Sequence, residues 1–475
     1  MVPWTVGDIM DLSILSKFSA EEILSGSFGI EWEALRAKDD GKLSLTPHPE
    51  VFGDKLTNPI ITTDFSESQI EIITPTFDSI DEAFDTFSLL SDIVNVSLPD
   101  DEFLWFQSIP CILPYWDKIP IVHYSSEGKD SEKYRQDLAR KYGVKKQMIS
   151  GVHFNFSFSD TFLKKLYALI NPFLTFKDFK NAIYLKISRN YIRYCWLIIY
   201  LTGCSIGSHK TFSNECIHLM DAQDGYGSYY STKGPSFRNA SCGYKNLNEL
   251  YPSYNNIEEF VCDVNKFIDD GDLSGARELY TQIRLKPKNP KNLLNSLVND
   301  GVQYIEVRTL DINPFYKCGL VLHDMKFLHL FLIYMLVKSE SDYGSWQKEA
   351  KFNEENTAER AYDESMRLLK EGNEVTLKSW ASEIINEMFG MCDVLGINEK
   401  HTLKLMLDRI ANVDLTYGKR LLKLIEKEGY INTHIILSKN NKKTSINSFN
   451  NAEWLKSDEV KKYLDLAFVC DNSFE

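Results

Sequence analysis

The chain has 475 residues, of which 43% are hydrophobic and 25% are charged, as is typical of a soluble globular protein with a large core. The formal net charge is −14, which argues against a general nucleic-acid-binding protein, because such a protein needs a basic face to replace phosphate counterions. A basic pocket for a small anionic substrate is still compatible with this charge.

The N-terminal part predicts short helices followed by a strand pair that carries two acidic residues. Residues 5–25 predict one or two short amphipathic helices, and residues 28–46 predict two strands joined at an Asp-Asp-Gly turn. Glu31 and Glu33 are two positions apart in the first strand, so their side chains share one face of it.

A further strand is predicted over residues 68–74, in which Glu71 lies among isoleucines. Burying an unpaired carboxylate is costly, and divalent cations are the natural partners of clustered carboxylates. These glutamates and the nearby Asp64 therefore predict a metal site. Two ordinary edge strands with solvated glutamates are the alternative, and the spacing alone does not decide between them.

Helices and strands alternate up to about residue 320, and the chain is mainly helical beyond it. This pattern predicts a sheet-and-helix core over 1–320 and a helical C-terminal region over 321–475 that packs on the core within one structural unit. The first long helix should begin at Asp78 or Ser79, either of which can cap it. We predict helices over 79–97, 131–142, 160–203 and 256–282, strands over 103–114, 148–159 and 301–315, a loop region over 204–254 and a basic loop over 286–292.

Two of these strands add residues suited to metal and phosphate chemistry. His153 lies in the alternating strand over 148–159, and Glu306 shares a face with Arg308 in the strand over 301–315. Each has a simpler interpretation, because His153 taken alone is more often a core histidine and Arg308 could merely pair with Glu306. The joint pattern is harder to explain in that way.

The nine cysteines are scattered and form no CxxC pair, which predicts reduced thiols in a cytoplasmic protein. The N-terminal sequence has no basic segment followed by a long apolar run, so it does not resemble a signal peptide. The longest apolar runs, over 195–201 and 327–337, are too short to span a membrane and predict buried helices instead.

Several common catalytic motifs are absent from the sequence. It contains no P-loop, no GxGxxG after a strand, no HExxH and no convincing GxSxG elbow, so a nucleophile mechanism has no support. The remaining candidates are hard oxygen ligands with an arginine, which favour Mg²⁺ or Mn²⁺ and suit phosphoryl transfer from ATP.

Seven segments, in this order and at about this spacing, resemble the bacterial type of the glutamate–cysteine ligase family. The resemblance runs from about residue 28 to residue 316 and continues more loosely beyond it. The segments are FGIEWEALR, HPEVFGDKLTNPIITTDFSESQIEIITP, QSIPC, YRQDLARKYG…MISGVHFNFS, RNYIRYCWLIIYLTG, FRNASCGYKN and YIEVRTLDINPF.

This resemblance implies an α+β, glutamine-synthetase-like fold, in which a curved, mainly antiparallel sheet holds the active site on its concave face and helices wrap it. It implies that Arg308 contacts the transferred phosphate of ATP, that Arg238 binds a substrate carboxylate, and that Glu33 and Glu306 are catalytic. The implied metal ligands are Glu31, Glu33, Asp64, Glu71, His153 and Glu306. The implied pocket for the cysteine side chain is formed by Phe65, Tyr134, Leu138, Tyr244 and Tyr280, of which Tyr280 lies where the sequence departs from the family pattern.

The activity implied is ATP-dependent ligation of the γ-carboxylate of L-glutamate to the amine of L-cysteine through a γ-glutamyl phosphate. The products would be γ-glutamylcysteine, ADP and phosphate, with Mg²⁺ or Mn²⁺ as the metal. No segment resembles the second ligase of fused glutathione-forming enzymes, so a separate glutathione synthetase would complete glutathione. Two alternatives stay open, namely a γ-glutamyl ligase for another amine and an inactive homologue that binds ATP or amino acids.

Overall fold

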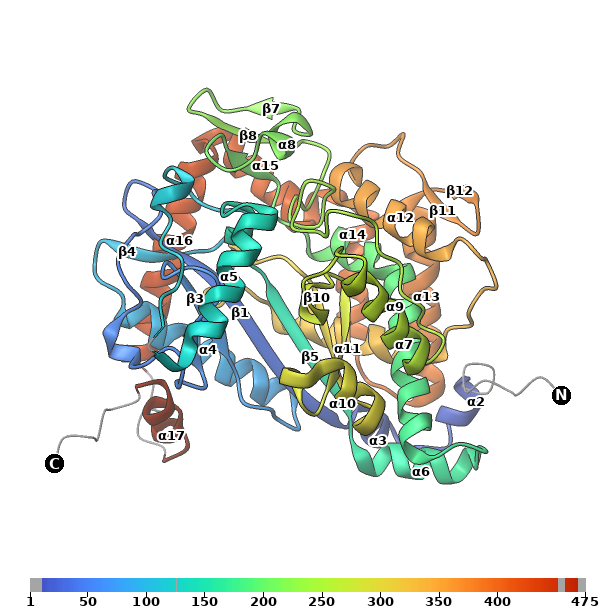
Figure 1. Ribbon diagram of the computed structural model, residues 1–475. Coiled ribbons are helices and arrows are strands. Elements are labelled where there is room, and N and C mark those ends of the chain that lie inside the picture. The colour runs from blue at the N-terminus through green and yellow to red at the C-terminus, as the bar shows by residue number, and fades with distance from the viewer. Residues whose placement is uncertain (1–10, 125, 452–457, 469–475) are drawn as a thin grey trace.

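The computed structural model describes residues 11–124, 126–451 and 458–468. Within this part, seven strands form one sheet in which every neighbouring pair is antiparallel (Figure 1). The order across the sheet is β2-β3-β1-β5-β10-β9, and β4 pairs with the far end of β1. The strands are β1 (Gly26–Lys38), β2 (Ile61–Thr63), β3 (Gln69–Ile73), β4 (Glu102–Trp105), β5 (Val152–Phe158), β9 (Ile283–Pro287) and β10 (Val302–Leu310).

Helices cover one face of this sheet, and the alternation of β1 shows why. Phe28, Ile30 and Trp32 are buried in the main hydrophobic core, while Glu31 and Glu33 point to the opposite face. The core side is packed by α4 (Ile80–Ser97), α7 (Phe176–Thr202) and α11 (Leu322–Val337). As predicted, α7 and α11 bury the two long apolar runs, and Ser79 caps α4 by accepting from the Glu82 backbone N–H.

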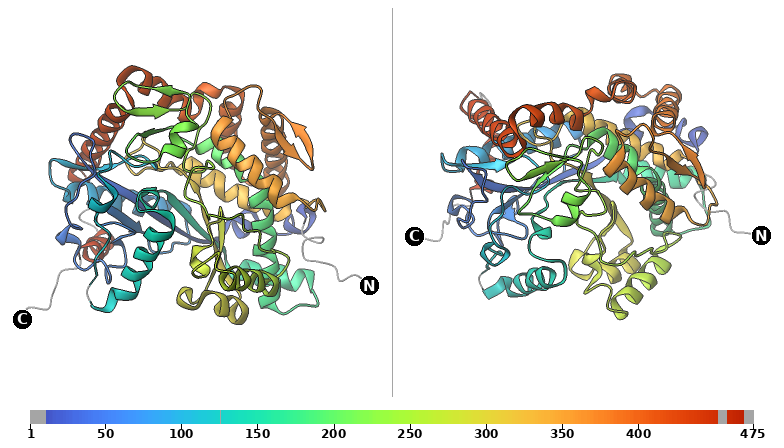
Figure 2. Two further views of the ribbon diagram at one scale, coloured as in Figure 1. Left: turned by 45° about the horizontal axis from the view of Figure 1, so that its top comes forward. Right: turned by 90° about the horizontal axis from the view of Figure 1, so that it is seen from above.

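The opposite side of the sheet is flanked by α5 (Lys129–Tyr142), α9 (Ile257–Asp269) and α10 (Leu293–Asp300). Figure 2, seen from above, shows these helices on one side of the sheet and the red helix α16 (Tyr430–Asn450) on the other. The remaining α-helices are α2 (Leu12–Leu15), α3 (Ala20–Leu24), α6 (Asp160–Ile170), α8 (Asn214–His218), α12 (Trp346–Arg360), α13 (Leu377–Leu395), α14 (Lys400–Ala411), α15 (Tyr417–Glu428) and α17 (Asp458–Ala467).

Two small sheets lie outside the main one. One has the strand order β6-β8-β7, and the other is the hairpin β11-β12. These strands are β6 (Gly207–His209), β7 (Ala222–Gln223), β8 (Ser228–Tyr230), β11 (Leu368–Lys370) and β12 (Asn373–Val375). Short 3₁₀ helices are η1 (Glu50–Phe52), η2 (Trp116–Lys118), η3 (Ser126–Gly128), η4 (Lys146–Met148), η5 (Ala276–Glu278), η6 (Pro290–Asn292) and η7 (Val413–Leu415).

The mixture of helices with an antiparallel sheet confirms the predicted fold class. The helices beyond residue 320 pack on the same core, because α11 contacts α7 and α16 contacts α4. The division of the chain at residue 320 stays a prediction.

Several local predictions are wrong. The segment 28–46 is one long strand, β1, followed by a turn with a single bridge between Ala37 and Leu43. The strand expected over 103–114 ends at Trp105, because the Gln107 side chain binds the next two backbone N–H groups and turns the chain. The helix expected over 256–282 ends at Asp269, and the "basic loop" at 286–292 begins inside strand β9.

The prediction that all cysteines are reduced is wrong for one pair in this structure. Cys216 on α8 and Cys242 form a disulfide, with their Cα atoms 5.2 Å apart. These cysteines are separated by 26 residues of mostly irregular chain, and only the folding of that segment brings them together. The sequence spacing carried no such signal.

Candidate active site

The open face of the sheet carries a row of charged side chains that follows the strand order. Glu71 on β3 lies directly opposite Glu33 on β1, and Glu31 on β1 lies opposite His153 on β5. On the other side of β5, Glu306 on β10 is paired in register with Asn155. Residues two apart on a strand share a face, so this register gathers candidates that are far apart in the sequence.

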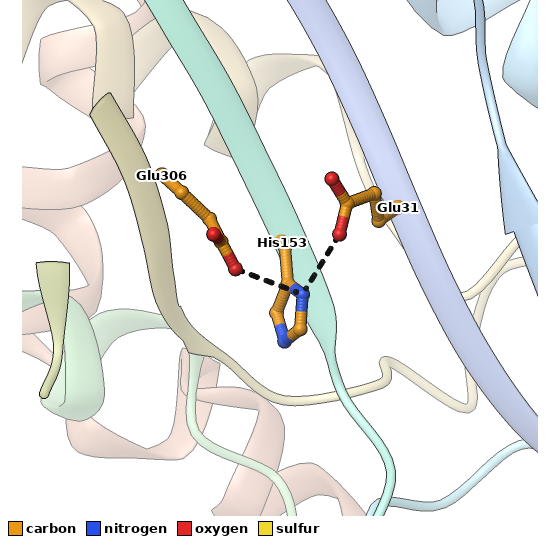
Figure 3. Close-up of side chains that lie close together, drawn as sticks. All are labelled: Glu31, His153 and Glu306. Carbon is orange, nitrogen blue, oxygen red and sulfur yellow. Dashed lines mark hydrogen bonds and ion pairs between the residues drawn. The ribbon is translucent and has the colours of Figure 1, made fainter. Parts of the chain in front are cut away.

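Glu31, His153 and Glu306 form the centre of this row (Figure 3). The Nδ1 atom of His153 lies 3.3 Å from Glu31 Oε2 and 3.5 Å from Glu306 Oε1. One donor atom from each of the three residues lies within 4.8 Å of the others, which is close enough for them to hold one metal ion. The second oxygen of Glu31 accepts from Asn155 Nδ2 at 2.8 Å, and this bond orients the carboxylate.

Cations occupy the β10–β9 side of the row. Arg308 Nη1 binds Glu306 Oε1 at 2.5 Å, and Lys286 on β9 forms an ion pair with the other oxygen of Glu306. Arg284, also on β9, is paired in register with Glu306. Lys286 and Arg284 were not predicted as site residues, although apolar residues alternate with these two in IRLKP and indicate a strand with a charged face.

The carboxylates on the two sides of the row differ in pKa. Burial and the neighbouring Asp64 charge raise the pKa of Glu33 to about 8. Burial, together with the charges of Asp64 and Glu31, also raises the pKa of Glu71 well above its ordinary value. Burial acts against the charge of Glu306 as well, but the adjacent Arg308 and Lys286 hold its pKa well below the ordinary value.

The acidic side therefore has more carboxylates than protein cations, which is the situation that a divalent ion relieves. A second observation points the same way, because Nε2 of the buried His153 has no hydrogen-bond partner among the described residues and faces Glu33 Oε1 at 3.9 Å. Carboxylate oxygens and imidazole nitrogen are suitable ligands for Mg²⁺ or Mn²⁺. The residues present therefore fit a divalent metal site.

A cavity opens beside this row and continues toward the loop after β8. Glu33, Asp64, His153 and Arg308 line it, and Arg238 lies beside Arg308, whose carbonyl accepts from Arg238 Nη1 at 2.6 Å. Residues of the loop over 244–254 and of helix α12 line the same cavity. Part of the long loop region over 204–254 therefore shares a cavity with the charged row.

Comparison with known proteins identifies the family. The profile described as glutamate-cysteine ligase matches residues 12–359, which is most of the chain. The chain belongs to the glutamate–cysteine ligase family.

Among the curated relatives, the glutathione biosynthesis bifunctional protein GshAB of Clostridium perfringens is 38% identical over 449 residues, covering 93% of this chain and 57% of that protein. GshAB of Listeria innocua is 36% identical over 436 residues, covering 89% of this chain and 56% of that protein. This member of the family therefore spans little more than half the length of these two curated relatives.

Two solved structures share the fold along most of the chain. The glutamate–cysteine ligase of Francisella tularensis, in complex with AMP, superposes with a TM-score of 0.85 at 27% identity, covering 93% of this chain and 92% of that one. The bifunctional glutathione synthetase of Pasteurella multocida gives a TM-score of 0.81 at 26% identity, covering 95% of this chain and 57% of that one.

Two of the five residues that resemblance to this ligase family places around the cysteine side chain line the cavity. Tyr244 and Tyr280 lie side by side, with ring centroids 4.5 Å apart and phenol oxygens 2.6 Å apart. Phe65 lies in a hydrophobic cluster against which Tyr244 packs, while Tyr134 and Leu138 lie on the facing helix α5. The roles of these five residues in this ligase-family protein stay predictions.

The aromatic group contains members that the sequence did not reveal. Tyr142 packs edge-on against Tyr244 and Tyr280, with centroids 5.5 and 5.7 Å away. Gln147 accepts from the Tyr244 hydroxyl at 2.9 Å, and the Asn246 side chain accepts from the Tyr280 backbone N–H at 2.9 Å. These contacts hold Tyr244 and Tyr280 in place from several segments of the chain, and no local pattern in the sequence predicts the contacts.

A membrane-spanning helix was not expected for this member of the family. Across the three described ranges, no helix combines the length and apolar character needed to cross a bilayer.

Proposed function

We propose that this protein joins the γ-carboxylate of L-glutamate to the amine of L-cysteine at the expense of ATP, forming γ-glutamylcysteine, ADP and phosphate. The observation that carries the proposal is the order of charge across the sheet. Carboxylates and one imidazole on β3, β1, β5 and β10 come first, and Arg308 and Lys286 follow at the β10–β9 edge. This arrangement matches a reaction in which metal-bound phosphates meet fixed cations.

The first step would transfer the γ-phosphoryl group of ATP to the γ-carboxylate of glutamate. The carboxylate oxygen attacks phosphorus, ADP leaves, and an acyl phosphate forms. Arg308 and Lys286 would bind the oxygens of the phosphoryl group, because both lie beside the buried Glu306 at the basic end of the row, where a fixed cation acts strongly. Arg308 stays protonated because, although burial opposes its charge, Glu306 and Glu33 raise its pKa.

Divalent ions, which we propose to be Mg²⁺ with Mn²⁺ as the alternative, would supply charge neutralisation to the phosphate oxygens when bound. Glu31, His153 and Glu306 would form the inner ligand set, since their donor atoms already converge. We assign Glu33, Glu71 and Asp64 to the same cluster because Glu33 and Glu71 lie opposite each other in the sheet and because, besides burial, the charge of Asp64 raises the pKa of both.

The second step would use the cysteine amine as the nucleophile. The neutral amine nitrogen attacks the acyl carbon, a tetrahedral adduct forms, and phosphate leaves with the electrons of the broken C–O bond while the nitrogen loses one proton to the departing phosphate. Arg238 would bind a substrate carboxylate, because its guanidinium lines the cavity beside Arg308. The adjacent rings of Tyr244 and Tyr280 would pack on the thiol methylene together with Phe65, Tyr134 and Leu138.

If the pathway continues to glutathione, a second ligase activity must act on the product. The match covers 57% and 56% of the two GshAB relatives, so more than two fifths of each lies outside it, and both are named as bifunctional proteins. We propose that a separate glutathione synthetase supplies that activity for this protein, and that both act in the cytoplasm.

The direct test is ADP release from ATP and glutamate with Mg²⁺, adding cysteine, 2-aminobutyrate, alanine, glycine and simple amines in turn. Strong stimulation by cysteine, weaker stimulation by 2-aminobutyrate and little by the others would support both the reaction and the aromatic pocket. Mass spectrometry of the product should detect γ-glutamylcysteine.

Two other results would separate the alternatives. Strong stimulation by a different amine would retain the ligase chemistry and overturn the choice of cysteine. Binding of ATP without turnover, whichever acceptor is supplied, would instead indicate a non-catalytic homologue. Repeating the assay with Mn²⁺ and with a chelator tests the metal separately from the acceptor.

A further inference from the structure

A buried carboxylate outside the charged row holds together the segments around Arg238. Asp311 follows strand β10, is 3% exposed and has both oxygens engaged. Its Oδ2 accepts from the backbone N–H groups of Cys204 and Ser205 at 2.9 and 3.0 Å and from the Ser205 hydroxyl at 2.7 Å. Its Oδ1 accepts from the Ser236 hydroxyl at 3.0 Å.

Arg238 depends on tertiary contacts for its position, because it lies in a loop without helix or strand. Its backbone N–H donates to the Ser205 hydroxyl oxygen at 3.2 Å. One residue later, Asn239 donates to the Ser236 hydroxyl oxygen at 2.9 Å and to the Thr309 carbonyl at 3.0 Å. The two serines that contact Asp311 are therefore the same two that hold the loop.

The direction of these hydrogen bonds is set by the carboxylate. An ionised Asp311 only accepts, so the hydroxyls of Ser205 and Ser236 must point their protons toward it. Their oxygen lone pairs are then free to accept from Arg238 and Asn239. A chain of polarised bonds of this kind strengthens each member and fixes one arrangement of the loop.

The charge of Asp311 acts on Arg238 directly as well. Burial lowers the pKa of Arg238, and the negative charges of Asp311 and Glu33 act against that effect. The guanidinium is therefore influenced by the charge of Glu33 in the charged row and by that of Asp311, and Arg238 lines the cavity next to Arg308.

We propose that Asp311 is a positioning residue that, through Ser205 and Ser236, fixes Arg238 for binding a substrate carboxylate. The inference rests on the proposed function for the identity of the ligand. It extends that function to a residue that contacts neither substrate nor metal and that acts on substrate binding by holding the loop of Arg238.

The test variant is Asp311→Asn. Its amide has the shape of the carboxylate, and its oxygen can still accept from the backbone N–H groups of Cys204 and Ser205. The variant removes the charge, and the amide NH₂ forces the hydroxyl that it faces to accept a hydrogen bond instead of donating one. The matched control is Asp324→Asn, because Asp324 is equally buried but bonds to Arg409 and Tyr417. With the full-length protein, KM for one amino-acid substrate should rise about tenfold or more in Asp311→Asn, as when an orienting partner of a ligand-binding group is lost. KM for ATP should not change, and Asp324→Asn should leave all three KM values unchanged.

A double-mutant cycle checks that the effect passes through Arg238. In an Arg238→Ala background, Asp311→Asn should have no further effect on the amino-acid KM, whereas an independent role would give additive effects. Hydrogen exchange gives a readout that needs no turnover. The amides of 236–246 should exchange faster in Asp311→Asn, while those of β1 keep the wild-type rate.

Three results would overturn the inference: an unchanged amino-acid KM, additive effects in the cycle, or unchanged exchange over 236–246. A uniform rise of every KM in both Asp311→Asn and Asp324→Asn would also overturn it, because it would show general destabilisation. A wild-type protein without cysteine-dependent turnover would instead contradict the proposed function, and the exchange experiment would then decide the inference by itself.

Discussion

Glu306 joins the acidic and basic sides of the charged row, so replacing it tests the row most directly. It is 1% exposed, and its two oxygens pair with Arg308 and Lys286 while Oε1 also faces His153 at 3.5 Å. The variant Glu306→Gln keeps the size of the side chain and removes its charge. It therefore perturbs the electrostatics of the site with little change in packing.

The expected loss of stability follows from the exposure of the partners. Removing one member of a buried ion pair typically costs about 3–5 kcal/mol. Arg308 and Lys286 retain 21% and 20% side-chain exposure, so water compensates part of their lost partner, and the repulsion between Glu306 and Glu31 disappears. We therefore expect a net loss of about 1–2 kcal/mol in the free energy of unfolding, with a folded protein remaining.

Activity should fall much further than stability. Glu306 supplies a candidate metal ligand and fixes Arg308, so cysteine-dependent ADP release should drop at least about 100-fold at saturating ATP and Mg²⁺. The control is Glu102→Gln, since Glu102 is also fully buried and pairs with Arg36, at the end of the sheet bearing β4. Near-normal turnover of Glu306→Gln, or an equal loss of turnover in the control, would refute the assignment of the charged row.

Two further changes test other parts of the structure. Lys286→Met should lower turnover about 100-fold and raise KM for ATP, because it removes a fixed cation from the basic end of the charged row. The control is Lys291→Met, which replaces a nearby exposed lysine and should have no effect in the same assay. Although burial opposes the charge of Glu102, bonds from Lys38 and Ser44 lower its pKa from 4.5 to about 2, so its contribution to stability is complete above about pH 4.5 and is lost as the pH falls toward 2. Urea unfolding of wild type and Glu102→Gln should therefore show a stability difference that narrows below about pH 4.5, and a constant difference down to pH 3 would contradict this.

Strands β1, β5 and β10, which carry much of the site, could be predicted because their polar and apolar residues alternate. Glu31 and Glu33 share a face of β1, and Glu306 and Arg308 share a face of β10, as the period of two requires. The main apolar helices followed from their length and composition. The general fold class and the charged row were thus within reach of the sequence.

The register of the strands and the long-range contacts could not be predicted from the sequence. Nothing local in the sequence says that Glu71 lies opposite Glu33, because antiparallel register is set by the turns and by the packing of the whole sheet. Lys286 was assigned to a loop because two prolines and two asparagines follow it closely in KPKNPKN, although a short alternating run precedes them. Tyr142 and Cys216 likewise acquire their partners only through tertiary folding.

Gly151 offers a test of Arg238 that leaves every charged residue in place. A Cβ atom added at this glycine would lie 2.2 Å from Arg238 Nη2 and 2.5 Å from its Cζ, so the guanidinium must move. The obstacle is the end of a flexible side chain, and the backbone of Gly151, whose carbonyl accepts from the Glu33 N–H at 3.1 Å, can stay in place.

Gly151→Ala should therefore raise KM for an amino-acid substrate about tenfold while the melting temperature and KM for ATP stay close to wild type, because only the carboxylate contact is displaced. Gly390→Ala is the matched control, since a Cβ there meets no atom within 4 Å. If Gly151→Ala bound both amino acids normally, Arg238 could not be the carboxylate contact in the position that the loop gives it. If the variant unfolded, the glycine would be needed for the backbone of β5 rather than for the space occupied by the guanidinium.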